Sequence, residues 1–137
     1  MAYATTNPYT GETVKTFPFA TDAEVEAAIA QADATFRQWK KTSFAERAKV
    51  MRAAAALLRK DKRAYAEILT LEMGKVVAEA EAEVELSAQI FAYYADNAES
   101  LLEPEKLPVA DKAEGAAMLV HEPLGVLLAI EPWNFPY

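Results

Sequence analysis

Few side chains in this sequence have both the type and the spacing that chemistry requires. The 137 residues include no cysteine and one histidine, His121. These counts exclude disulfides, thiolate metal sites and a cysteine nucleophile within the chain, and they argue against a serine–histidine–aspartate triad. The four glycines are too scattered for a phosphate-binding fingerprint: Gly11, Gly74, Gly115 and Gly125. Most groups of a self-contained enzyme are therefore missing.

The densest group of titratable residues is an acidic run in a region with helical periodicity, formed by Glu79, Glu81, Glu83 and Glu85. Carboxylates two positions apart on a helix do not converge, so we expect no metal site. Like charges at i,i+4 cost a few tenths of a kcal/mol (about 0.2–0.5), and the helix dipole partly offsets that cost. The run is interpreted as a solvated helix face.

A second candidate is the segment Ile130-Glu131-Pro132-Trp133-Asn134-Phe135-Pro136. Considered without further information, Asn134 lies between two prolines and would be a turn residue. Trp133 and Phe135 would then be core aromatics. His121 has no identifiable partner and is interpreted as a satisfied or edge-strand histidine.

Four amphipathic helices are expected to position these residues. Capping boxes at Thr21–Glu24 and Ser43–Glu46 predict the first two helix starts, and Gly74 is the expected C-cap of the third. Glu72 and Lys75 are interpreted as a helix end and its packing partner. The helical periodicity covers about 21–40, 44–58, 61–73 and 76–102.

Extended segments flank the helices. A β-prone run covers Thr13–Phe17, and two apolar runs follow the helices at about 116–121 and 124–130. The last run is almost continuously apolar, as in a strand of a parallel sheet that is buried on both faces. Such a strand needs neighbours on both edges, which two strands after four helices do not supply. The C-terminus is therefore expected to resemble the middle of a larger fold.

Composition limits the possible partners. The chain is 53% hydrophobic and 26% charged, with a net charge of −7 and a pI near 4.8. The length suits one compact domain, and the acidity argues against a nucleic acid or an anionic membrane as the main partner. No apolar run approaches the roughly 20 residues of a membrane span. No signal-peptide pattern opens the chain, so the expected location is cytoplasmic.

The segment Ile130–Pro136 resembles the Pro-Trp-Asn-(Phe or Tyr)-Pro turn that follows an apolar strand in the aldehyde dehydrogenase superfamily. Three further motifs resemble family elements in order and spacing: Asn7–Glu12, Glu72–Lys75 and Pro123–Val126. The resemblance covers all 137 residues but only the N-terminal part of the family. Among subfamilies the chain is most similar to bacterial succinate-semialdehyde dehydrogenases.

The resemblance implies an α/β fold, in which an N-terminal helical layer precedes the first strands of the Rossmann-like cofactor-binding domain. This chain would be mostly helical. Residues 1–104 would form the helical part, 105–123 a β-arm used in subunit pairing, and 124–137 the first strand of the cofactor sheet with its turn. A homo-oligomer is the implied assembly.

The implied activity is NAD- or NADP-dependent oxidation of a small aldehyde, succinate semialdehyde in particular, through attack by a cysteine thiolate. Asn134 matches the oxyanion-hole asparagine. Ile130, Pro132 and Trp133 match cofactor-cleft positions, and Phe135 matches a wall of the aldehyde tunnel. The family's cysteine, general-base glutamate and glycine-rich turn lie downstream of the matched part. The chain alone is therefore expected to be inactive.

An alternative from another class is a stand-alone, non-catalytic helical interaction module derived from the same family. Capped helices over about 21–102 could bury a modest core by themselves. However, a module adapted to stand alone should not carry two exposed apolar strands, which promote aggregation. The strands favour the dehydrogenase segment, and they predict self-association of the isolated chain through 116–131.

Overall fold

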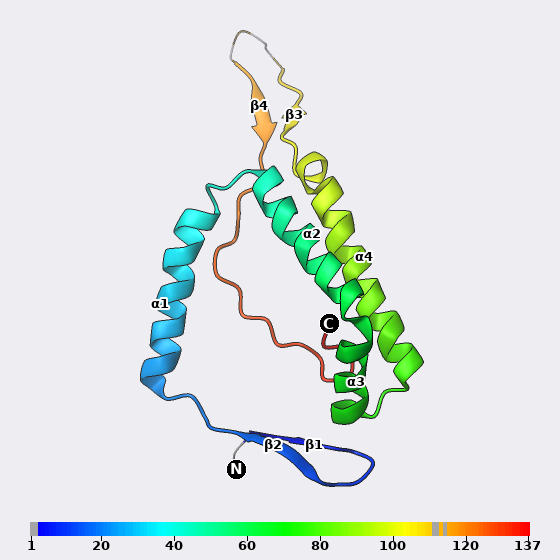
Figure 1. Ribbon diagram of the computed structural model, residues 1–137. Helices are drawn as coiled ribbons and strands as arrows, with labels where there is room; N and C mark the ends of the chain where they lie inside the picture. The colour runs from blue at the N-terminus through cyan, green and yellow to red at the C-terminus, as the bar shows by residue number, and fades with distance from the viewer. Residues whose placement is uncertain (1–2, 111–112, 114) are drawn as a thin grey trace.

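The computed structural model describes residues 3–110, 113 and 115–137. Most of the chain is helical, as the sequence predicts (Figure 1). The elements, in chain order, are β1 (Tyr3–Thr6), β2 (Thr13–Phe17), α1 (Asp22–Trp39), α2 (Phe44–Lys60), α3 (Lys62–Met73), α4 (Val77–Leu101), β3 (Glu105–Leu107) and β4 (Ala117–Leu119).

The predicted helix ends are confirmed. The Thr21 backbone N–H donates to the Glu24 carboxylate at 2.8 Å, and the Glu24 N–H donates back to the Thr21 hydroxyl at 3.3 Å. Ser43 and Glu46 form the same reciprocal pair at the start of α2. Gly74 ends α3 with a φ of 80°, in the left-handed region that glycine adopts without steric cost. Local capping chemistry therefore sets these boundaries.

The core lies where α4 packs against α2 and α3. Val84 is the largest side chain that is fully buried, and Leu69 is 3% exposed. The other buried apolar residues are small and let the helices approach closely: Ala55, Ala66, Ala80, Ala88 and Ala95.

Helix α1 takes no part in this core. It stands apart from α2–α4 in Figure 1 and contains no buried residue. Its apolar stripe stays half exposed, with Val25 at 46% and Ile29 at 54%. The segment after β4 passes nearby: a Cβ on Gly125 would lie 3.9 Å from the Phe36 ring. The amphipathic pattern thus predicted the helix correctly but not a partner for its apolar face.

Two antiparallel hairpins flank the helices. β1 pairs with β2, and β3 pairs with β4 in a register that places Glu105 opposite Leu119. The β3–β4 hairpin projects beyond the end of the helical layer (Figure 1). It lies within residues 105–123, the segment predicted as a β-arm. β4 is shorter than the predicted extended run over 116–121.

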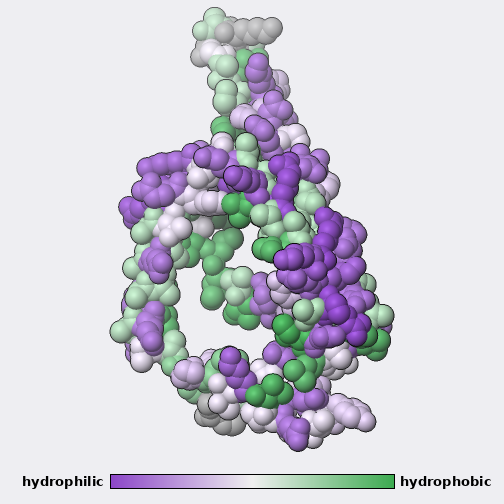
Figure 2. Space-filling model, viewed as in Figure 1, coloured by the Kyte–Doolittle hydropathy of each residue, from purple (hydrophilic) through white to green (hydrophobic). Residues whose placement is uncertain are grey.

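No described strand pairs with residues 124–130, so their role as the first strand of the cofactor sheet stays a prediction. These residues form irregular backbone, with Leu124 90% exposed, Leu128 88% and Ile130 85%. The physical reason is the one that makes the pattern unusual, since a strand buried on both faces requires adjacent strands that the described residues do not offer. Figure 2 shows hydrophobic residues bordering an opening between α1 and the other helices.

Candidate functional site

The segment 130–135 holds every residue that the family resemblance assigned to a site. The Phe135 N–H donates to the Pro132 carbonyl at 3.0 Å, which closes a turn around Trp133 and Asn134. Asn134 is half-buried, whereas Trp133 is 76% exposed and Phe135 54%. The turn interpretation of Asn134 is confirmed, but the two aromatics are not core residues here. Ile130 and Pro132 are exposed as well.

Lys75 connects the helical layer to this turn. Its ammonium donates to the backbone carbonyl of Asn134 at 2.9 Å and lies 3.6 Å from the centroid of the Phe135 ring. It also forms an ion pair with Glu83. The side chain of Lys75 is 8% exposed and that of Glu83 is 3% exposed, so both charges are buried and mutually neutralised.

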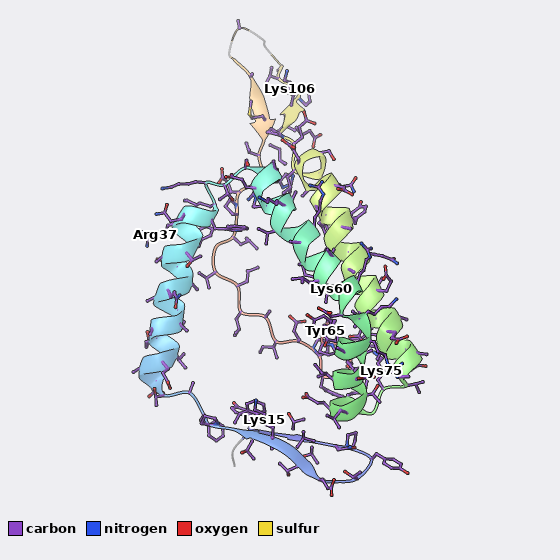
Figure 3. All side chains as sticks on the ribbon, in the orientation of Figure 1. Lys15, Arg37, Lys60, Tyr65, Lys75 and Lys106 are labelled. Carbon is purple, nitrogen blue, oxygen red and sulfur yellow. The ribbon has the colours of Figure 1, made fainter. Side chains whose placement is uncertain are left out.

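Glu83 contacts the turn directly too. Its second carboxylate oxygen accepts from the backbone N–H of Tyr137 at 3.3 Å. The Tyr137 hydroxyl donates to the Tyr65 carbonyl at 3.2 Å, and the two rings lie edge to face at 5.8 Å. Burial raises the pKa of the Tyr137 phenol above 10.0, with a further contribution from charges that include Glu72. Figure 3 labels Tyr65 and Lys75, which lie beside the end of the chain.

A cavity of about 340 Å³ lies between α3 and the turn. Helix α3 supplies one wall, and the residues around Asn134 supply the other. The lining residues are Ile68, Leu69, Glu72, Met73, Trp133, Pro136 and Tyr137.

The acidic run is not a uniform solvated face, which corrects the sequence interpretation. Glu83 is buried against Lys75, while Glu81 and Glu85 lie partly buried beside arginines of neighbouring helices. Each of the three pairs with a cation that lies outside α4, on a neighbouring helix or in the loop before it, so repulsion along the helix is compensated from outside it. Over the ranges described, no cluster of acidic or histidine side chains could hold a metal ion, and no helix is long and apolar enough to span a membrane.

Sequence reasoning missed the role of Lys75 and Glu83 at the turn. One signal was available, because Glu83 follows Ala80 by three positions and precedes Ser87 by four, which places it on the buried face of α4. A carboxylate on that face requires a cation. Lys75 was recognised only as a packing partner of the end of α3.

The Asn134 amide is the chemically informative group. Among the described residues its side chain has no hydrogen-bond partner, although the backbone on both sides is held. Trp133 and Phe135 flank it. A neutral amide donor displayed on a turn whose backbone is held can stabilise negative charge that develops on a small molecule.

The helical layer, its hairpin and this turn define the N-terminal part of a dehydrogenase fold. A sequence model described as the aldehyde dehydrogenase family matches residues 1–137, and the chain belongs to that family. It is similar to the NADP(+) succinate-semialdehyde dehydrogenase of Deinococcus radiodurans, with 51% identity over 134 residues, covering 98% of this chain and 28% of that protein. A Mycobacterium tuberculosis enzyme of the same name is 52% identical over 136 residues, covering 99% and 30%.

The solved structure of succinic semialdehyde dehydrogenase from Streptococcus pyogenes, in complex with NADP+, is also similar. It superposes with a TM-score of 0.92 at 40% identity, covering 99% of this chain and 30% of that one. The chain therefore spans less than a third of the length of these relatives.

Proposed function

We propose that this chain is the N-terminal segment of a cytoplasmic NAD(P)-dependent aldehyde dehydrogenase that oxidises succinate semialdehyde to the carboxylic acid. The observation that carries the proposal is the free Asn134 amide on a turn that buried charges hold in place. The relatives that share about half of the sequence support the substrate, and their names favour NADP+ as the cofactor.

Asn134 acts on the charge that develops when the aldehyde carbonyl is attacked. As a nucleophile adds, the carbonyl oxygen becomes an oxyanion, and the side-chain N–H of Asn134 donates a hydrogen bond to it. The amide is neutral and carries no titratable proton, so it works as a fixed dipole at every working pH. An ionised aspartate at this position has no N–H and could not replace it.

The neighbouring apolar residues suit the cofactor and the substrate. Ile130, Pro132 and Trp133 expose apolar surface that fits the faces of a nicotinamide and its ribose, and Phe135 offers an aromatic wall to a short aldehyde chain. When bound, NAD(P)+ supplies the acceptor for the hydride. The chain's own contribution is to bind these apolar faces, orient the carbonyl toward Asn134 and exclude water.

The remaining groups of the reaction lie outside this sequence. The chain has no cysteine, so the nucleophile comes from other residues of the working enzyme. The general base and the phosphate-binding turn come from there as well. The 137 residues alone are accordingly inactive and bind the cofactor weakly. The hairpin within 105–123 serves as a subunit contact in a homo-oligomer.

The first test is the intact mass of the protein as its native cell produces it. A mass several times 15.1 kDa, accompanied by succinate-semialdehyde oxidation with NAD(P)+, is expected. A native mass of 15.1 kDa without a second polypeptide would overturn the proposal in favour of a non-catalytic interaction module.

The second test is Asn134→Ala in that native enzyme. Loss of one oxyanion donor is expected to lower kcat by about 100- to 1000-fold with the cofactor dissociation constant unchanged. Asn97→Ala is the matched control, because the bond that the Asn97 amide donates among the described residues goes to the Tyr93 carbonyl within α4. An unchanged kcat in Asn134→Ala would remove the oxyanion role.

A further inference from the structure

The buried ion pair joins Lys75, in the loop between α3 and α4, to Glu83 on α4, and three separate contacts run from it to the turn. Lys75 holds the Asn134 carbonyl and lies against the Phe135 ring, and Glu83 holds the Tyr137 N–H. We propose that Lys75 and Glu83 are positioning residues that aim the Asn134 amide at the oxyanion. This inference rests on the proposed function of Asn134.

The geometry explains how backbone contacts aim a side chain. The Asn134 carbonyl belongs to the peptide plane that follows its Cα, and the Phe135 N–H in the same plane donates to Pro132. With that plane held from both sides, the position of the Asn134 Cα is fixed, and only its ψ and its two side-chain torsions remain to direct the amide. The Tyr137 N–H fixes the chain three residues further on. An oxyanion donor must be positioned to within about 0.5 Å, so such backbone anchors matter for the rate.

The chemistry of the pair is matched to this task. Lys75 directs its ammonium at the Glu83 carboxylate, the Asn134 carbonyl and the face of the Phe135 ring. Glu83 uses one oxygen for Lys75 and the other for the Tyr137 N–H. Well-packed apolar residues often stabilise a fold as much as a buried ion pair does. What apolar residues cannot supply is a donor for one point of the turn and an acceptor for another.

A neighbouring ion pair provides the matched control. Arg63 on α3 and Glu81 on α4 pair at 3.2 Å across the same two helices. Their side chains are more exposed, at 62% and 33%, and neither contacts residues 130–137. Replacing this pair removes charges from the α3–α4 interface and leaves the turn untouched.

The experiment compares two double variants in the native enzyme. Lys75→Met with Glu83→Leu removes the charged pair with similar volume, and Arg63→Met with Glu81→Leu is the control. We expect the first variant to lower kcat by about 100-fold, as a misplacement of about 1 Å does, while its thermal midpoint and cofactor dissociation constant stay near wild type. The control keeps the wild-type kcat.

A mutant cycle with Asn134→Ala separates positioning from a general structural role. If the pair acts through Asn134, its removal costs little further rate once the amide is gone. An equal loss of kcat in both backgrounds, or no loss in the first, overturns the inference. If the double variant does not fold, Glu83→Gln takes its place in the cycle. Lys75 and the Tyr137 N–H contact different oxygens of Glu83, and glutamine replaces one of those oxygens with an NH2 group, which donates and cannot accept.

A readout without catalysis keeps this inference distinct from the proposed function. The chain has three asparagines, at positions 7, 97 and 134, so 15N-asparagine labelling gives few signals. Both the variant and the control chain also carry Leu124→Lys and Leu128→Lys, which remove exposed apolar surface and keep them monomeric. We expect the Asn134 backbone and side-chain signals to show fast motion in the Lys75→Met, Glu83→Leu chain and not in the control. Unchanged rigidity of Asn134 overturns the positioning role. A rigid turn in a protein that oxidises no aldehyde overturns only the proposed function.

Discussion

The helical layer α2–α4 and the segment 124–137 are both rich in apolar residues, but only the layer supplies most of its own stabilising contacts. The layer contains its own helix caps, ion pairs and small core. Among its described residues, the segment 124–137 has no helix cap, ion pair or core of its own, and only residues 134–137 are anchored by contacts with the layer. Leu124 and Leu128 are almost fully exposed, and the described contacts that hold residues 134–137 come from α3, α4 and the loop between them.

This difference separates structure that nearby residues determine from structure that requires contacts with distant residues. A helix satisfies its backbone hydrogen bonds internally, so its pattern predicts its structure even where packing is sparse, as α1 demonstrates. A strand satisfies its backbone only through neighbours, so the same clarity of pattern leaves 124–130 irregular. The site residues lie in the segment 124–137, and their positions are fixed by contacts from the helical layer α2–α4.

Breaking the buried pair Lys75–Glu83, which links the layer to the segment, should cause the largest loss of stability. Glu83→Ala leaves the Lys75 ammonium buried without its carboxylate, which is expected to lower the free energy of unfolding by about 3–5 kcal/mol. Glu81→Ala removes one of the two carboxylate partners of Arg63, which is 62% exposed and keeps Glu67, and should cost about 1 kcal/mol or less. Urea denaturation of both variants checks this, and equal losses would contradict the burial argument.

The exposed apolar segment should make the isolated chain self-associate. Leu124, Leu127 and Leu128 present apolar surface that has no cover in this structure. Sedimentation velocity is expected to find oligomers, and Leu124→Lys with Leu128→Lys should shift them toward monomer. Leu86→Lys on α4, at a site that is 53% exposed, is the control and should leave the distribution unchanged. A wild-type monomer would contradict the prediction.

Gly74 tests the junction between the layer and the N-terminal hairpin. Its φ is +80°, and a Cβ there would lie 3.1 Å from Cγ of Pro8. Gly74→Ala should cost about 1–2 kcal/mol for the left-handed conformation, plus the cost of displacing Pro8. Gly11→Ala shares the positive φ of +75° but has nothing within 4 Å. Thermal denaturation should show a larger loss of stability for Gly74→Ala than for Gly11→Ala. Equal losses would show that the contact with Pro8 does not contribute.

The smallest expected effect is a loss of helix at low pH, when the capping glutamates Glu24 and Glu46 become protonated. Hydrogen bonds from the backbone N–H groups of Thr21 and Ser43, with help from their hydroxyls, hold the pKa values of Glu24 and Glu46 below 4.5. Because the folded values are depressed, the caps stabilise α1 and α2 above pH 4.5 and lose that effect as the pH falls through the folded values. Circular dichroism at 222 nm should therefore show a step of helix loss.

The Glu24→Gln, Glu46→Gln variant tests that assignment. Glutamine still accepts from the cap backbone but does not titrate in this range, so the acid step should shrink. An unchanged step would assign it to other carboxylates, such as Glu85, whose pKa the Arg59 guanidinium lowers.

Much of the fold could be predicted from the sequence because its signals are local. The Thr21 and Ser43 caps, the Gly74 terminus and the run Thr13–Phe17 each depend on residues within a few positions. The turn at Asn134 was predicted for the same reason. What could not be predicted depends on contacts between distant positions.

Two of those contacts concern the site. The charge pattern of α4 suggested a solvated face, because the cations that compensate it lie on other helices or before α4. The anchoring of Asn134 joins positions 59 residues apart, and no spacing rule relates them. The site residues themselves were identified by resemblance, while the buried charges that hold the turn required the three-dimensional arrangement.

The separation of these contacts along the chain also has a temporal meaning. Lys75 meets Glu83 after closing a loop of eight residues, whereas it meets Asn134 only after closing one of 59. The entropic cost of closing a loop increases with its length, so assembly should follow the order of synthesis. The Lys75–Glu83 pair would form before residues 134–137 emerge from the ribosome. Residues 134–137 would then meet a binding surface on α3, α4 and the loop between them that has already formed.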